Sequence, residues 1–193
     1  MDMVESQLAD DLRVTDVLVD SASRYLYEAG GKRVRPMLAI LTAQLGDGNT
    51  QAVIEAAKAV ELTHLGSLYL LFSRSSQLMA KRGERAIRLQ ADTFERLVLG
   101  QLHETVGPQP GDDAVQFYLQ VLADKTGSLI AAAAQSGVIF SNAPAAYEEP
   151  MVTYGEKVGV AFQLLDDVID LSDDAAETGK VPGTDLRAGV ATM

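Results

Sequence analysis

The sequence predicts an all-α protein, and three observations carry this prediction. Apolar residues recur at helical period along most of the chain, and segments that alternate apolar and polar residues are nearly absent. Clusters rich in glycine and proline separate the periodic segments, as expected of turns between helices. With 193 residues, 47% of them hydrophobic, the chain is long enough for a single helical domain with its own core.

The first half of the chain divides into three predicted helices. Thr15-Asp16 can cap a helix that ends at the glycine pair Gly30-Gly31. A second helix follows Pro36 and ends near the turn cluster at residues 46–49. A third helix is expected from Gln51 to about residue 69.

The second half continues the pattern. A fourth helix is predicted from Gly83 to about Val106, followed by a loop over residues 107–113. Two helical stretches, residues 114–123 and 128–140, are expected on either side of a break. A long helix should run from about residue 147 to residue 171, and the remainder of the chain is polar.

Composition excludes several classes of function. The absence of cysteine excludes disulfides, thiolate metal sites and cysteine nucleophiles, and a formal net charge of −11 argues against a nucleic-acid partner. The apolar runs are too short to cross a bilayer, so no integral membrane segment is expected. The first twelve residues carry acidic side chains and lack the basic region and apolar core of a signal peptide, which indicates a cytoplasmic location.

Three carboxylates interrupt the apolar pattern of the last predicted helix. Asp166 and Asp170 are one helical turn apart, and Asp167 lies three residues before Asp170, so all three can reach one patch. Like charges this close repel one another unless cations neutralise them, and oxygen ligands without histidine or cysteine nearby suit magnesium. A solvated acidic helix face is the alternative, but the surrounding apolar residues favour metal binding.

Basic and hydroxyl side chains occur at three further places. Residues 32–35 hold three cations after a glycine pair and could cradle a diphosphate, although a basic surface loop is the alternative. His64 lies on a largely apolar helix, where a lone histidine is more often a satisfied core residue than a ligand. Lys125 and Thr126 offer a cation and a hydroxyl at the predicted helix break, a pattern that alone indicates nothing.

Taken together and in this order, these motifs resemble those of the trans-isoprenyl diphosphate synthase (polyprenyl synthetase) family. The resemblance extends from Gly30 to Met193. It implies an isoprenoid-synthase-type helical bundle around a central active-site cleft. It also implies a prenyltransferase that uses Mg²⁺ to condense isopentenyl diphosphate with an allylic diphosphate. A homodimer packed through helix faces is implied as well, with a heterodimer as the alternative.

The resemblance also assigns roles to individual residues. The positions that match substrate-binding residues of the family are Lys32, Arg35, His64, Lys125, Thr126, Gln163 and Lys180. The positions that match its second aspartate-rich motif, and so its Mg²⁺ ligands, are Asp166, Asp167 and Asp170. Asp166, Asp167 and Lys125 are the implied catalytic residues. Gln101 matches a family glutamine near the cleft.

The sequence departs from the family at one internal point. The family carries a first DDxxD motif shortly after the region of His64, whereas here Tyr69 runs directly into Leu70, which begins what resembles the next helix. The segment that should hold the first metal motif is therefore missing between Tyr69 and Leu70, and so are the family's C-terminal helices after Met193. Either the natural protein has these residues, which we favour, or the chain is a catalytically silent regulatory subunit of a heteromeric synthase.

Two small residues bear on the length of the product. In the family, residues four and five places before the first DDxxD form the floor of the tunnel that receives the growing chain. If that motif resumes just after Tyr69, these positions are Gly66 and Ser67, which leave space for further five-carbon units. A long-chain product is therefore expected. The alternative is that Gly66 only allows two helices to approach closely.

Overall fold

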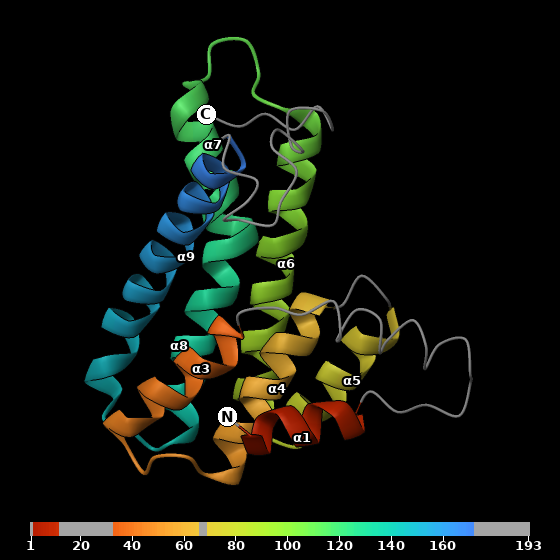
Figure 1. Cartoon of the computed structure of the whole chain (residues 1–193), viewed down its shortest axis with the longest axis vertical. Helices are drawn as coiled ribbons and strands as arrows, with labels where there is room; N and C mark the ends of the chain where they lie inside the picture. The colour runs from red at the N-terminus through yellow and green to blue at the C-terminus, as the bar shows by residue number, and fades with distance from the viewer. Residues whose placement is uncertain (1, 12–32, 66–68, 172–193) are drawn as a thin grey trace.

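The structure is a computed structural model that describes residues 2–11, 33–65 and 69–171, and all of its regular elements are helices (Figure 1). The α-helices are α1 (Asp2–Asp11), α3 (Val34–Thr42), α4 (Gln51–Leu65), α5 (Tyr69–Ala80), α6 (Glu84–Val106), α7 (Ala114–Leu122), α8 (Ser128–Phe140) and α9 (Glu148–Leu171). Two short 3₁₀ helices, Ala43–Leu45 and Ala145–Tyr147, follow α3 and precede α9. The all-α prediction is confirmed.

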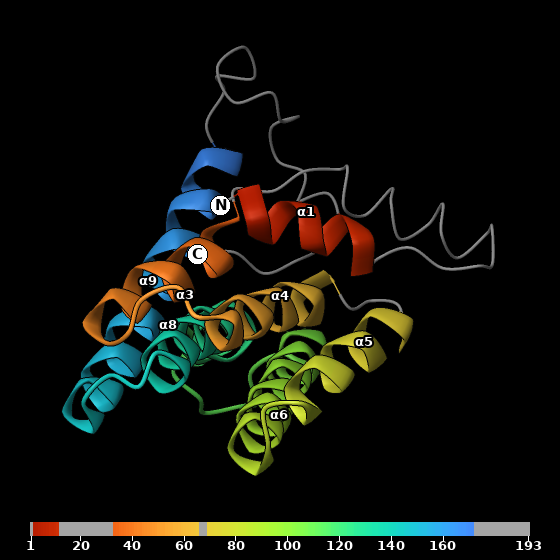
Figure 2. The same cartoon turned by 90° about the horizontal axis from the view of Figure 1, so that it is seen from below.

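Helix α8 lies at the centre of the molecule. It contacts α3, α4, α6 and α9, and in the end-on view of Figure 2 these helices lie around it. Its sequence is rich in alanine and apolar on every side, and ten of its thirteen residues are buried. A helix with small side chains can be surrounded at close range, which gives α8 its central place in the core.

Close contact between α8 and α3 depends on one glycine. A Cβ atom added at Gly137 would overlap the hydroxyl group of Thr42 and the backbone carbonyl of Ala39. The same hydroxyl group donates a hydrogen bond of 2.9 Å to the carbonyl of Ala134 on α8. The two helices are therefore in backbone contact at this point, and no side chain larger than hydrogen fits between them.

The structure also corrects the predicted elements. The break expected at residues 125–127 is wrong, because Ala123–Gly127 form a turn of π-helix that joins α7 to α8 without interruption. Helix α1 was not predicted, and α3 begins at Val34, so that Pro36 lies in its first turn, where a missing N–H costs nothing. Helix α4 ends at Leu65 and a separate helix, α5, begins at Tyr69. The helix expected after Thr15 lies outside the described residues.

None of the described helices could cross a membrane. Helices α6 and α9 are long enough, with 23 and 24 residues, but acidic and basic side chains interrupt both of them.

Candidate active site

One pocket of about 430 Å³ opens between the amino-terminal end of α3 and the helices α4, α6, α8 and α9. It collects six of the residues that the sequence predicts to act on substrate or metal: Arg35, His64, Lys125, Thr126, Gln163 and Asp166. These residues are up to 131 positions apart in the sequence (Arg35 to Asp166), so only the packing of the helices around α8 brings them together. Apolar side chains form another part of its wall, namely Val34, Leu97, Leu129, Ile130 and Phe162.

The basic side of the pocket is built on a buried carboxylate. Glu61 of α4 is 2% exposed and accepts a hydrogen bond of 3.2 Å from Arg33, which also pairs with Glu5 of α1 at 3.1 Å. Arg35 lies 3.9 Å from the other carboxylate oxygen of Glu61. Neither Arg35 Nε nor Glu61 Oε2 has a hydrogen-bond partner among the described residues. Burial lowers the pKa of Arg35, although Glu61 partly offsets this effect.

The sequence pattern includes Arg33 only as one of the three cations of residues 32–35, and Glu61 was not predicted as a site residue. Arg33 has a backbone φ of 47° at the start of α3, in the left-handed region that few residues other than glycine adopt. Glu61 could have been found from its position three residues before His64 on an apolar helix, because a charged side chain there must face a partner. Glu61 pairs with both arginines, and all three residues line the pocket.

His64 lies near Arg33 and Arg35 on the basic side of the pocket. His64 is exposed to the pocket, but the surrounding protein partly desolvates its ring, and this desolvation together with the nearby charges of Arg35 and Arg33 lowers the pKa of His64 to about 4. The imidazole is therefore neutral near neutral pH and can both donate and accept a hydrogen bond.

The low pKa of His64 predicts how stability depends on pH. In the unfolded chain His64 titrates near its ordinary value of 6.5, and in the folded chain near 4. The unfolded state therefore takes up a proton that the folded state does not, and the free energy of unfolding should fall as the pH is lowered through this interval. Urea unfolding at about pH 7 and about pH 5 measures the change.

A replacement of His64 separates this effect from those of other groups. His64→Gln should lose most of the pH dependence between these two values, whereas His103→Gln, on an exposed part of α6, should retain it. Burial raises the pKa of Glu55 and Glu148, but hydrogen bonds to neighbouring side chains outweigh burial, so both pKa values lie below the ordinary value of 4.5. The stabilisation that these two carboxylates give is therefore lost only as the pH falls below about 4.5. A wild-type protein equally stable at both pH values would contradict the assignment.

The π turn supplies the next two groups. Its longer hydrogen-bonded loop, a feature that often occurs at functional sites, presents Lys125 towards α6 and Thr126 towards α9. Lys125 Nζ lies 2.6 Å from a carboxylate oxygen of Glu104 on α6, and the Thr126 hydroxyl donates to Gln163 on α9 at 3.1 Å. Gln101 is outside the pocket lining and donates to the same oxygen of Glu104 at 2.9 Å. A cation and a hydroxyl group thus face the cavity between two helices.

The acidic motif on α9 divides between two environments. Asp166 lines the pocket, whereas Asp167 is 8% exposed and accepts a hydrogen bond from the Tyr118 hydroxyl of α7. Asp167 also accepts a hydrogen bond of 3.1 Å from Gln163. Asp170 lies in the last turn of α9, and its side chain is outside the described part of the structure. Among the described side chains no group of three or more carboxylates and histidines is arranged to hold a metal ion.

Four of the predicted site residues lie outside the described residues: Lys32, Gly66, Ser67 and Lys180. Their roles stay predictions. The remaining residues define a pocket with basic groups on α3 and α4, a lysine and a threonine at the π turn, and a carboxylate on α9. Such an arrangement suits a ligand with more than one anionic group and an apolar portion.

Comparison with known proteins agrees with this geometry. The family described as Polyprenyl synthetase matches residues 16–70 and 67–193, which is nearly the whole chain. The chain belongs to this family. Its members include proteins of the helical fold expected from the sequence, so the isoprenoid-synthase-type bundle is confirmed.

Individual members of the family are similar over almost the full length of the chain. A nonaprenyl diphosphate synthase of Mycobacterium tuberculosis is 37% identical, and the alignment covers 98% of this chain and 66% of that synthase. A heptaprenyl diphosphate synthase component 2 of Geobacillus stearothermophilus is 29% identical over 89% of this chain and 64% of the relative. The chain therefore spans slightly less than two thirds of the length of these two polyprenyl synthetases.

Solved structures show the same relationship. A geranylgeranyl pyrophosphate synthase of Corynebacterium glutamicum, complexed with calcium and isoprenyl diphosphate, superposes with a TM-score of 0.87 at 35% identity and covers 98% of this chain and 67% of that one. A polyprenyl synthase of Caulobacter crescentus, with the same ligands, gives a TM-score of 0.90 at 25% identity, covering 100% of this chain and 68% of that one.

The alignments also contain internal gaps. The alignment with the M. tuberculosis synthase extends over 222 positions, whereas the chain has 193 residues, so at least 29 positions of that synthase have no counterpart here. The family matches in two stretches that meet at residues 67–70.

Proposed function

We propose that the protein is a trans-prenyltransferase that condenses isopentenyl diphosphate with an allylic diphosphate to make a long-chain polyprenyl diphosphate. The observation that carries this proposal is the single pocket in which Arg35 and His64, Lys125 and Thr126, and Asp166 meet beside an apolar wall. Two diphosphates need two sets of donors, and an apolar wall suits the isoprenoid chains. The relatives support a long-chain product, because several of them are named as nonaprenyl, heptaprenyl or octaprenyl diphosphate synthases.

The polar side chains of the pocket form two sets, and each set binds one of the two substrates. Arg35 and His64, with Lys32, bind the diphosphate of isopentenyl diphosphate and orient its double bond towards the allylic carbon. Lys125 and Thr126, with Lys180, bind the allylic diphosphate, and the positive charges stabilise the negative charge that develops as it leaves. Leu97, Leu129 and Phe162 exclude water, which would otherwise react with the allylic cation.

A magnesium ion fits the acidic side of the pocket. The donors there are oxygen atoms, Asp166 faces the cavity, and the histidine lies near Arg33 and Arg35. The ligands would be Asp166, Asp167 and Asp170. Mg²⁺ bound there would neutralise negative charge on the diphosphate as it leaves.

We also infer a homodimer in the cytoplasm. Helix α6 carries a row of exposed apolar side chains near its carboxyl end, and such a row is expected to be covered by a partner: Val98, Leu99, Leu102 and Val106. A heterodimer would use the same face. The absence of cysteine and the acidic composition are in keeping with a cytoplasmic location.

A second candidate function rests on the internal gap. The two stretches of family match meet at residues 67–70, which supports the proposal that a segment with the first DDxxD is missing between Tyr69 and Leu70. If the natural protein truly lacks it, the chain acts as a catalytically silent subunit of a heteromeric synthase. Small residues at Gly66 and Ser67, next to this gap, are the proposed floor of the product tunnel.

One assay tests both functions. The chain, and a variant that carries the corresponding segment of the M. tuberculosis synthase between Tyr69 and Leu70, are incubated with Mg²⁺, isopentenyl diphosphate and farnesyl diphosphate, and the products are sized. We expect products longer than twenty carbons from the variant that contains the segment. No product from either protein would contradict the enzyme, and elongation that stops after one addition, at twenty carbons, would contradict the long-chain assignment.

A further inference from the structure

The π turn is held between two helices by close backbone packing. On α6, a Cβ atom at Gly100 would lie 2.9 Å from the Cβ atom of Asp124 and 3.0 Å from the backbone nitrogen of Lys125. On α9, a Cβ atom at Gly159 would lie 2.7 Å from the Cα atom of Gly127. The turn therefore has no free space on either side, and its position fixes the side chains that it presents to the pocket.

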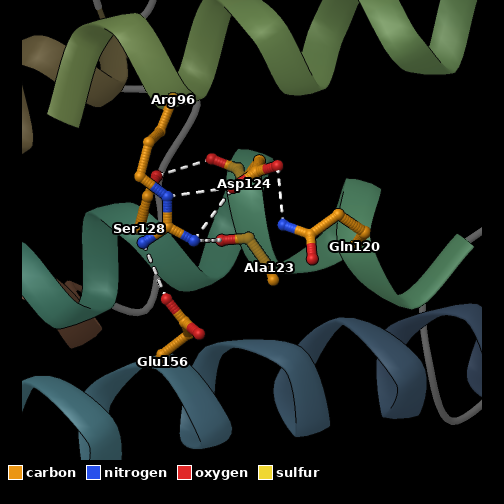
Figure 3. Close-up of polar contacts among 6 residues, drawn as sticks. All are labelled: Arg96, Gln120, Ala123, Asp124, Ser128 and Glu156. Carbon is orange, nitrogen blue, oxygen red and sulfur yellow. Dashed lines mark hydrogen bonds and ion pairs between the residues drawn. The ribbon is translucent and has the colours of Figure 1, made fainter. Parts of the chain in front are cut away.

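Polar contacts to the turn converge on Arg96 of α6 (Figure 3). Arg96 Nε donates to Asp124 Oδ1 at 2.9 Å, and its Nη1 donates to Glu156 of α9 at 2.7 Å. A further nitrogen of the same guanidinium group lies 3.5 Å from the carbonyl oxygen of Ala123. One side chain thus connects α6, the first residues of the π turn and α9.

Asp124 is fully engaged in this network. Its second carboxylate oxygen accepts a hydrogen bond of 2.9 Å from Gln120, and its backbone carbonyl accepts one of 2.6 Å from the Ser128 hydroxyl (Figure 3). Asp124 is 9% exposed, so loss of its charged partner would leave a buried carboxylate without compensation. Because a buried charge without a partner is unfavourable, the turn would shift so that the Asp124 carboxylate reaches water or another partner.

Arg96 does not itself reach the substrate pocket. It is absent from the described lining of that pocket and instead lines a separate cavity of about 330 Å³ between α6, α8 and α9. Asp124 and Glu156 neutralise the charge of Arg96, so Arg96 attracts an anion in the substrate pocket only weakly. Arg96 can therefore affect ligand binding only by changing the position of the π turn.

We propose that Arg96 is a positioning residue of the pocket, which acts through Asp124 to hold the π turn in place. Lys125 and Thr126 follow Asp124 directly in this turn, and both line the pocket. A displaced turn would move the cation and the hydroxyl group together. The inference rests on the proposed function only in that the ligand of these two side chains is a diphosphate.

Two measurements on the full chain test the proposal. Calorimetry gives the affinity for inorganic diphosphate, and amide hydrogen exchange followed by mass spectrometry gives the protection of residues 122–128. Arg96→Gln should weaken diphosphate binding about tenfold, as the loss of a supporting contact usually does, and should speed exchange in this segment. Asp124→Asn should have the same effects, and adding it to Arg96→Gln should cause little further loss.

Matched variants separate positioning from stability alone. Arg88→Gln removes an exposed arginine of α6 that pairs with Glu84 on its own helix at 2.8 Å, and should change neither measurement. Glu156→Gln removes the other charged partner of Arg96. It should lower the thermal midpoint clearly but weaken diphosphate binding less than Arg96→Gln does. Arg96→Lys, which keeps the charge but cannot bridge both carboxylates in the same way, should fall between wild type and Arg96→Gln.

The outcomes distinguish this inference from the proposed function. If Lys125→Ala weakens diphosphate binding and Arg96→Gln changes neither affinity nor exchange, the positioning role is wrong. If the wild-type chain binds no diphosphate, the proposed function fails, and faster exchange of residues 122–128 in Arg96→Gln still supports the role of Arg96 in holding the turn. Unchanged exchange in that case overturns the role as well.

Discussion

Replacing Asp166 and Asp167 together by alanine should lower Mg²⁺-dependent turnover about a hundredfold or more, because several kilocalories per mole of charge stabilisation would be lost. The structure separates the two contributions. Asp166 faces the pocket, so Asp166→Ala alone should carry most of the functional loss. Asp167 also anchors α9 to Tyr118, so Asp167→Ala should lower stability, whereas Asp167→Asn keeps a hydrogen-bond acceptor there.

Turnover is measured by product formation, and Mg²⁺-dependent binding of farnesyl diphosphate is measured by calorimetry, so that a loss is visible even where turnover is low. The control is Asp92→Ala with Glu95→Ala, which makes the same change in charge at two exposed positions of α6. Far-ultraviolet circular dichroism should stay helical in both proteins. Unchanged turnover and unchanged binding in the Asp166 and Asp167 double variant would rule out the metal site.

The largest effect on stability is expected at Gly137. Gly137→Val would force a branched side chain against Thr42 and the backbone of Ala39, where even a Cβ atom overlaps. Overpacking of this kind costs about 3 kcal/mol or more, because a backbone carbonyl cannot move aside as a side chain can. That is a large part of the total stability of an ordinary domain, which is about 5–15 kcal/mol.

Denaturant unfolding followed by circular dichroism measures this loss. Ala161→Val, at an exposed position of α9, adds the same kind of branched side chain to a helix and should change stability by about 0.5 kcal/mol or less. A Gly137→Val protein as stable as Ala161→Val would show that α3 and α8 do not pack as closely as described.

The elements that could be predicted from the sequence are those with a strong local signal. The bounds of α6 and α9 followed from helical periodicity and from the turns beside them, and Gly83 and Gly107 flank α6 as expected. The π turn could not be predicted, because lysine, threonine and glycine between two apolar helices are also typical of a break. Tertiary packing against Gly100 and Gly159 keeps this segment helical, and that packing leaves no local pattern.

The site shows the same limit. Arg35, His64, Lys125 and Asp166 could be chosen by their chemistry and order, and the structure brings them to one pocket. Arg96 could not, because it acts only on other groups of the protein, and its charged partners lie 28 and 60 positions away. Supporting contacts of this kind depend on the fold as a whole.

The π turn also has a consequence for the helical phase of the chain. An α-helix advances by about 100° per residue, so the single extra residue of a π turn rotates everything after it by that angle. Helix α7 lies on the surface with one side exposed, whereas α8, its continuation, is buried on nearly all sides. Removal of one residue from Ala123–Gly127 would therefore turn the whole of α8 within its ring of neighbours and carry Gly137 away from α3. The length of this turn therefore sets which face of α8 packs against α3.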